Sequence, residues 1–251
     1  MSSVLQIPAL PARMLDPGMT TLLRRGLVSY WPLDEASGTR RDVRDAGNVL
    51  TDNNTVTGVA GPSVNLPLAS DFVAANTEYL SHVPHQSLSM GPGMRATFAG
   101  WVLINTASST VQTFLSIWAA GGQRAYVVRT LSSRYSAAVT ADGTTAVTVS
   151  ADTFGVPPTA TWHFLVVIYT GGILGISVNG GAFNTVAHTG DIIGTTVVTA
   201  FEIGRANSNG QYLNGSMCAW GLWDRALPNR EIAALYNGGL GLSLAQVGGR
   251  T

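Results

Sequence analysis

The segment Trp162-His-Phe-Leu-Val-Val-Ile-Tyr-Thr170 decides the fold class, because large side chains alternate along it. One side of the alternation carries Trp162, Phe164, Val166 and Ile168. Such a period of two is typical of a β-strand, whose successive side chains point to opposite faces. A second apolar run, at residues 173–178, ends at Asn179-Gly180, a pair that accepts the positive φ of a tight hairpin turn. Together the two runs predict an antiparallel strand pair.

The same pattern extends over most of the chain. Further strands are predicted at residues 27–33, 96–105, 112–118, 125–130, 135–140, 146–150, 182–187, 198–203 and 211–223. One helix is predicted at 228–236, with Asn229 as its cap and Gly238-Gly239 at its end. Many short strands followed by one terminal helix predict an all-β, antiparallel β-sandwich.

The composition excludes several classes of protein. The chain has 251 residues, of which only 11 % are charged, and all 14 basic residues are arginine. A net charge of zero argues against a nucleic-acid partner, which requires a basic face. The apolar content of 45 % argues against disorder, and the single Cys218 argues against a disulfide scaffold. No apolar run reaches the roughly 18 residues of a membrane span, so no membrane partner is expected.

The ends of the chain differ from its middle. Residues 1–25 contain three prolines, which disfavour a long helix, and we expect an extended N-terminal arm there. The arm is apolar, so it is expected to lie on its own domain or on a neighbouring subunit. The residues expected to make this contact are Leu5, Ile7, Leu10, Met14 and Leu15. The sandwich is predicted at 26–242, followed by a tail at 243–251. The arm lacks a continuous apolar signal region, and we expect synthesis in the cytoplasm.

Three segments, taken in order, resemble one family. They are Leu27-Val-Ser-Tyr-Trp-Pro-Leu-Asp-Glu-Ala-Ser-Gly-Thr39, the 162–172 strand followed by Ile176-Ser-Val-Asn-Gly180, and Leu222-Trp-Asp-Arg-Ala-Leu-Pro-Asn-Arg-Glu-Ile-Ala-Ala-Leu-Tyr-Asn237. They resemble the opening strand, the hairpin and the closing strand and helix of laminin-G-like, concanavalin-A-like proteins. The resemblance covers about residues 26–242 and implies a jelly-roll sandwich. Stand-alone chains of this kind resemble phage virion proteins, and other relatives bind glycans or hydrolyse them.

The residues do not favour an enzyme. A glycosidase needs two carboxylates roughly 5–5.5 or 6.5–9.5 Å apart, which related enzymes carry as Glu-x-Asp-x-Glu on one strand. The chain has four glutamates, none with an acid two residues away: Glu35, Glu78, Glu202 and Glu231. Cys218 lies within a predicted strand, where a cysteine is usually a small buried hydrophobe. We therefore expect no catalytic residue.

Calcium is the one cofactor that the resemblance leaves open. In the family, the loop after the Ser-Gly-Thr motif often holds a calcium ion, which implies Asp42, Asp45 and Asn48 as ligands here. Calcium prefers six to eight oxygen ligands. The acid that relatives add in the last strand is replaced by Cys218 and Ala219, and three arginines, at 40, 41 and 44, lie in the same loop. The expectation is therefore no cofactor, with calcium as the alternative.

Four aromatic residues near predicted strand ends are candidates for stacking on sugars. They are Trp118, Tyr126, Tyr135 and Tyr212. The alternative for each is burial in the sandwich with its polar tip exposed.

Two functions of different class follow. The first is a non-enzymatic structural protein of a virion, a phage capsid decoration protein at the virion surface, anchored in part by its arm. Its partners would be other virion proteins, the major capsid protein in particular, and copies of itself; a trimer is implied by resemblance alone. The uncharged surface suits such packing. The alternative is a glycan-binding, lectin-like protein of a tail or host-attachment appendage.

Overall fold

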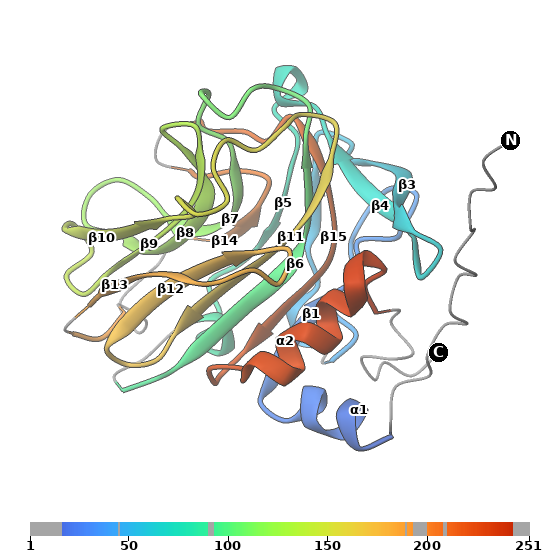
Figure 1. The fold of residues 1–251 in the computed structure, drawn as a ribbon. Coiled ribbons are helices and arrows are strands. Elements are labelled where there is room, and N and C mark those ends of the chain that lie inside the picture. The colour runs from blue at the N-terminus through green and yellow to red at the C-terminus, as the bar shows by residue number, and fades with distance from the viewer. Residues whose placement is uncertain are drawn as a thin grey trace, which may run out of the picture.

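The computed structural model describes residues 17–44, 46–89, 93–188, 190–192, 200–207 and 210–242. In this part of the chain two antiparallel sheets pack face to face, and a short helix, α2 (Asn229–Tyr236), follows the last strand (Figure 1). The prediction of an all-β sandwich with a C-terminal helix is confirmed.

The first sheet has eight described strands, all paired antiparallel. Its order is β13 (Asn184–Ala187), β12 (Ile173–Val178), β11 (Trp162–Tyr169), β6 (Ala96–Ile104), β15 (Gly215–Trp223), β4 (Leu66–Phe72) and β3 (Thr57–Ser63), with β1 (Leu27–Trp31) also paired to β15. We call it the eight-stranded sheet. Strands β6, β11 and β15 form its centre, which explains why they are the longest apolar runs in the sequence.

The second sheet has seven described strands, and we call it the seven-stranded sheet. Its order is β10 (Ala146–Ser150), β9 (Arg134–Thr140), β8 (Arg124–Leu131), β7 (Thr113–Trp118), β14 (Phe201–Ile203), β5 (Tyr79–His82) and β2 (Thr51–Asn53). Short 3-10 turns at 46–48, 74–76, 86–88 and 237–239 complete the regular structure.

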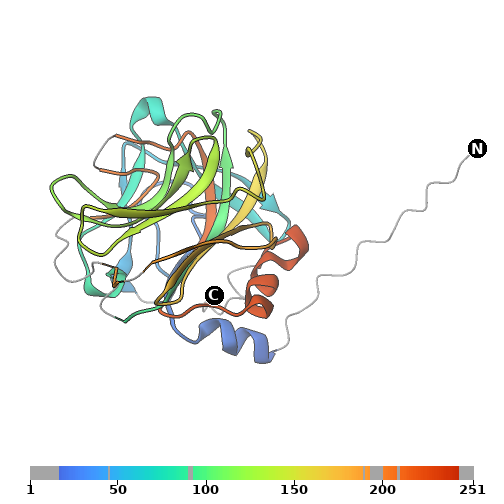
Figure 2. The same ribbon diagram turned by 60° about the vertical axis from the view of Figure 1, so that its left-hand side comes forward.

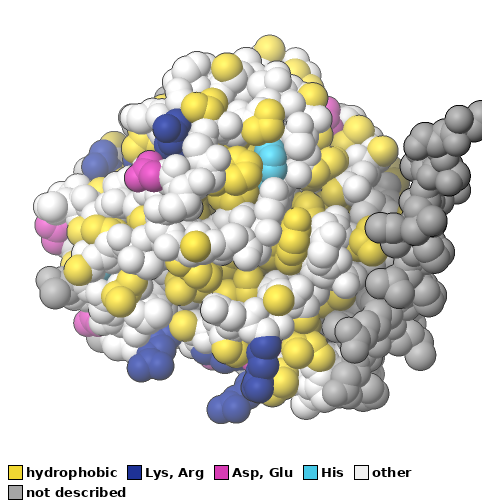
Figure 3. Space-filling view, in the orientation of Figure 1, with side chains coloured by type: hydrophobic (Ala, Val, Ile, Leu, Met, Phe, Trp, Pro, Cys, Tyr) yellow, Lys and Arg dark blue, Asp and Glu magenta, His cyan; other side chains and the backbone are white. Residues whose placement is uncertain are grey.

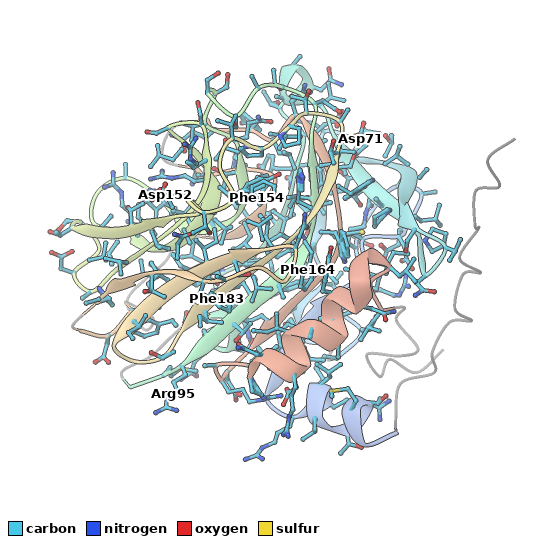
Figure 4. The ribbon with its side chains drawn as sticks, viewed as in Figure 1. Asp71, Arg95, Asp152, Phe154, Phe164 and Phe183 are labelled. Carbon is cyan, nitrogen blue, oxygen red and sulfur yellow. The ribbon has the colours of Figure 1, made fainter. Side chains whose placement is uncertain are left out.

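Strand β11 shows how the alternation in the sequence works. Its odd-numbered residues, such as Leu165 and Val167, lie in the core between the sheets. Its even-numbered residues, such as Phe164 and Val166, lie on the opposite face and are also buried. This face needs a second cover. That cover is α2, which lies along the outer face of the eight-stranded sheet (Figures 1 and 4).

A second helix, α1 (Pro17–Arg24), packs beside α2 and corrects the prediction of an extended arm. Proline is tolerated at the first helical position, so Pro17 begins this helix rather than preventing it. Leu23 is fully buried, and the Trp223 indole Nε1–H donates to its carbonyl oxygen at 2.7 Å. The Arg225 guanidinium donates to the Leu22 carbonyl at 2.6 Å. Residues 17–24 therefore belong to the folded domain.

The predicted hairpin turn is confirmed. Asn179 and Gly180 have φ values of 53° and 70°, and they join β12 to the segment leading to β13. The Asn179 side-chain oxygen accepts from the Phe164 backbone N–H at 2.9 Å, and the Phe164 carbonyl accepts from the Asn179 N–H at 2.8 Å. The turn is thus fixed to β11. The cap of α2 was predicted wrongly, because Pro228 is its first flanking residue and makes no side-chain cap.

Strands β2 to β5 were not predicted as strands, and β3 shows the reason. It contains Gly58, Gly61 and Pro62, and none of its residues is buried. An edge strand that is exposed on both faces has no apolar alternation to detect. The surface of the domain carries little charge, and few charged side chains appear on the face that Figure 3 shows.

The predicted arm residues Leu5, Ile7, Leu10, Met14 and Leu15 lie outside the described residues, and so does the tail at 243–251. Within the described ranges, neither helix has the length and apolar character that crossing a membrane requires.

We expect Leu23→Ala to lower the free energy of unfolding by about 2–5 kcal/mol, because it leaves a cavity between α1 and the sheet. Urea denaturation of the full chain measures this change. Arg24→Ala, at an exposed position of the same helix, is the control and should have little effect. Equal stabilities of the Leu23→Ala variant and the wild type would contradict the packing of α1 on the domain.

Candidate functional site

The outer face of the seven-stranded sheet is the surface on which the fold places polar and aromatic side chains together. Both described α-helices lie on the other sheet, as a second view also shows (Figure 2). One row of paired residues crosses this outer face from strand to strand. It consists of Thr51, Ser81, Glu202, Ser116, Val127, Ala138 and Thr148. The row is polar toward β2 and β5 and apolar in the middle.

Toward the β5 end, two tyrosines and an arginine form the first cluster, which we call the tyrosine cluster. The Tyr79 and Tyr212 ring centroids are 6.3 Å apart. The Arg205 guanidinium carbon lies 3.6 Å from the Tyr79 centroid and 6.0 Å from that of Tyr212. Both tyrosines are half-buried, so each ring keeps part of its surface in contact with solvent.

A buried ion pair supports this cluster. Glu202 is 1 % exposed, and its Oε1 accepts hydrogen bonds from both Nε and Nη2 of Arg205. Burial raises the pKa of the Glu202 carboxyl above its ordinary value of 4.5, although Arg205 and the Asn207 backbone amide act to lower it. The pair holds the guanidinium in place over Tyr79 and cancels its charge. Arg205 therefore acts here as a flat, fixed surface.

Toward the β8 end lies the second cluster, which we call the tryptophan cluster. Trp118 packs with Val127, Ala138 and Ala206. The guanidinium carbons of two arginines of β8 lie over its ring, at 5.4 Å for Arg124 and 5.7 Å for Arg129. Such cation–π contacts stabilise a positive charge over an indole.

The loop after β14 connects the two clusters. Arg205 contributes to the tyrosine cluster, and its chain neighbour Ala206 contributes to the tryptophan cluster. The Ser116 hydroxyl of β7 donates to the Arg205 carbonyl at 2.9 Å, which fixes the loop on the sheet. The two clusters therefore belong to one surface.

Of the four aromatic residues predicted to stack on sugars, Tyr126 and Tyr135 are corrected by the structure. Both lie in the core between the sheets, with 1 % and 0 % of their surface exposed. The Tyr126 hydroxyl donates to the Leu88 carbonyl, and the Tyr135 hydroxyl pairs with His163 Nδ1. Neither ring has a free face for a sugar. Trp118 is also corrected, because it is buried beneath its arginines with 4 % of its surface exposed, whereas Tyr212 retains partial exposure.

The predicted calcium loop is held by hydrogen bonds of its own. Asp42 Oδ1 accepts from the backbone N–H groups of Tyr30 and Arg44, each at 3.0 Å. The Asn48 amide donates to Ser29 Oγ at 2.7 Å and to Ser87 Oγ at 3.0 Å. Asp45 lies outside the described residues. Across the described ranges, no three His, Cys, Asp or Glu side chains gather as a metal-binding group, and calcium binding stays a prediction.

The other glutamates and the cysteine occupy structural positions. Glu35 pairs with Arg41 at 3.0 Å, Glu78 accepts from the Val73 N–H, and Glu231 pairs with Arg225. Burial raises the pKa of the Cys218 thiol well above its ordinary value. A thiol in this state is a poor nucleophile.

A hollow at the opposite edge of the sandwich is a second candidate site. It lies where β10 and β13 approach each other, with a cavity volume of about 180 Å³. Phe154, labelled in Figure 4, lines it together with Ile176 and Val178, and Thr153 and Asn184 form its polar part. Ligand pockets usually measure roughly 300–1,000 Å³, so this hollow is small for a whole ligand.

The two antiparallel sheets form a jelly-roll sandwich that known proteins share. The model of the concanavalin A-like lectin/glucanases superfamily matches residues 75–233, which is more than half of the chain. The chain belongs to this superfamily, as the resemblance had implied. No curated protein matches the chain by sequence.

Solved structures share the fold at low sequence identity. The binding domain of Paraclostridial Mosquitocidal Protein 1 has a TM-score of 0.68 at 9 % identity, covering 86 % of this chain and 52 % of its own. The binding domain of Botulinum Neurotoxin DC, in complex with SialylT, has a TM-score of 0.61 at 9 % identity, covering 86 % and 52 %. The chain thus spans about half the length of these toxin domains.

A third similar structure is matched over nearly its whole length. It is domain 4 of AbnA, an extracellular arabinanase of Geobacillus stearothermophilus, in complex with arabinotriose. Its TM-score is 0.55 at 13 % identity, and the match covers 82 % of this chain and 96 % of that one. At these identities the likeness concerns the fold alone.

The raised pKa of Glu202 predicts how stability depends on pH. From the unfolded-state value near 4.5 up to the higher folded-state value, the folded protein holds more protons than the unfolded chain. The free energy of unfolding contributed by this group therefore falls as pH rises through that window. In Glu202→Gln the contribution is absent. Urea denaturation across this pH range should show the wild type losing stability relative to the variant as pH rises; a difference independent of pH would contradict the assignment.

Proposed function

We propose that this domain is a non-enzymatic, lectin-like module that binds glycans on the outer face of its seven-stranded sheet. The observation that carries the proposal is the tyrosine cluster, where Tyr79 and Tyr212 are half-exposed and fixed by Arg205. Rigid aromatic rings at a surface bind ligands without a large loss of side-chain entropy.

The chemistry around the tyrosines suits a sugar. The C–H face of a pyranose ring is apolar and packs on the face of an aromatic ring, while its hydroxyl groups need hydrogen-bond partners. Asn53 lies opposite Tyr79 in the β2–β5 pair, and its amide donates to Ser81 Oγ at 3.0 Å. Both side chains are partly exposed, and Asn207 is exposed nearby in the loop that follows β14. Amide and hydroxyl groups of this kind can both donate to and accept from a sugar hydroxyl.

The similar structures give independent support. One of the toxin binding domains was solved in complex with SialylT, and the arabinanase domain in complex with arabinotriose. These facts concern those proteins, and they favour a binding role for this fold over a catalytic one. They also give the lectin-like function more support than a place in a virion shell.

The virion decoration role stays a prediction. Its arm residues lie outside the described part of the chain. The homo-oligomer and the capsid partner also stay predictions. A lectin-like function is compatible with an appendage on a virion.

The tyrosine cluster is tested by a glycan array on the full chain, followed by calorimetry with the best glycan. We expect Tyr79→Ala and Tyr212→Ala each to weaken binding by about tenfold, or ~1.4 kcal/mol. Tyr212→Phe keeps the ring and should keep most of the affinity.

Phe154→Ala is the matched control, because it removes an aromatic ring from the hollow at the other edge. Its affinity should equal that of the wild type. Loss of binding in Phe154→Ala with full binding in both tyrosine variants would move the site to the hollow. Absence of binding to every glycan would reject the proposed function.

A further inference from the structure

The tryptophan cluster holds two like charges against one indole ring. The guanidinium carbons of Arg124 and Arg129 lie 5.4 and 5.7 Å from the same indole centroid. Both side chains are half-buried. The Nε–H groups of both are buried and have no hydrogen-bond partner among the described residues. One contact to a carbonyl is present, from Arg124 Nη1 to Thr144 O at 3.4 Å. Most of the hydrogen-bonding capacity of the two guanidinium groups is thus unused by the part of the chain that the structure describes.

Acid partners are present for other arginines but not for these two. Ion pairs join Arg41 to Asp34 at 2.9 Å, Arg205 to Glu202, and Arg225 to Glu231. Within the described ranges, neither Arg124 nor Arg129 has a carboxylate oxygen within 4.0 Å.

The two acids that flank β10 have other contacts. Asp142 Oδ1 accepts from the backbone N–H groups of Thr144 and Thr145, at 2.8 and 2.7 Å. Asp152 lies 3.8 Å from Arg134 Nε, and its side chain is 73 % exposed. Neither acid therefore offsets the charge at Trp118.

The two positive charges of Arg124 and Arg129 beside Trp118 are unfavourable without an anion. Burial and the neighbouring Arg124 both lower the pKa of Arg129, yet a guanidinium stays protonated in proteins. The cation–π contacts with Trp118 offset part of the repulsion. An anion bound to these guanidinium groups would offset the remainder, and planar guanidinium forks are suited to a carboxylate or sulfate.

We propose that Arg124 and Arg129, held on Trp118, form a subsite for the carboxylate or sulfate group of an acidic glycan. The proposal rests on the proposed function, since the neutral part of that glycan would contact the tyrosine cluster. Arg205 is unsuited to this role because both its Nε and its Nη2 donate to Glu202. One end of the face thus binds the sugar ring, and the other end binds the charged substituent.

The anion subsite is tested first without any glycan, by NMR of the arginine Nε–H signals in the ¹⁵N-labelled full chain. Burial of these groups slows their exchange with water and favours detection. The probes are sodium acetate and sodium methyl sulfate, with sodium chloride at equal ionic strength as reference. We expect saturable shifts at Arg124 and Arg129 and none at Arg24, an exposed arginine on α1. Acetate and methyl sulfate distinguish a carboxylate ligand from a sulfate ligand.

Variants then assign the effect. Arg129→Gln and Arg124→Gln should each weaken anion binding by about tenfold, as expected for the loss of one charge-assisted partner. Arg124→Lys and Arg129→Lys should retain part of it, and Arg24→Gln should change nothing. Shifts that grow linearly without saturation, or that are equal at Arg24, would overturn the proposal.

A glycan arm separates this inference from the proposed function. Lactose, 3′-sialyllactose and 3′-sulfolactose share one neutral core and differ in the charged substituent. If the core binds, the charged sugars should bind more tightly, and Arg129→Gln should remove that advantage while leaving lactose unchanged. Equal affinities for all three would overturn the subsite alone. Saturable anion binding with no affinity for any glycan on the array would reject the proposed function and keep the subsite.

Discussion

The fold depends on one constraint: the central strands of the eight-stranded sheet are apolar on both faces. On β6, Val102 faces the other sheet and Trp101 faces the helices, and both are buried. Such a sheet must be covered twice, since leaving either face in water would expose large apolar surface. The seven-stranded sheet covers one face, and α1 and α2 cover the other. The polar side of the molecule is therefore the outer face of the seven-stranded sheet.

This constraint also explains the placement of the few charges. Arg225 and Glu231 pair beside the α1–α2 contact, and Arg41 pairs with Asp34 and Glu35 in the loop after β1. These pairs hold helices and loops on the sandwich. On the seven-stranded sheet, Arg124, Arg129 and Arg205 lie over aromatic rings. So little net charge gives little long-range attraction, which agrees with the proposed contacts through ring faces and hydrogen bonds.

The sequence was sufficient where a residue's environment follows from its neighbours along the chain. The alternation in β6 and β11 and the Asn179-Gly180 turn are of this kind. It was insufficient where segments far apart in the chain determine the environment of a residue. Helix α1 is held by Trp223, 200 residues away. The alternation of β8 places Tyr126 and Val128 on one face and Val127 on the other, but only the packing of the second sheet shows that the face of Tyr126 is the inner one. Tyr79 was overlooked because its partners come from another part of the chain, although the Glu202-x-x-Arg205 spacing was a visible signal.

The two aromatic clusters differ in a way that bears on recognition. Both place a guanidinium over an aromatic ring, but among the described residues of the two clusters only Arg205 has an acid beside it. Glu202 is itself buried, so separating it from Arg205 would leave an unpaired charge in a poorly solvated site. Arg205 is therefore fixed, while Arg124 and Arg129 keep donors for an incoming group. Because the sheet holds the clusters apart, with Tyr79 on β5 and Trp118 on β7 and β14 between them, a ligand with one neutral and one anionic end would bind in a single orientation.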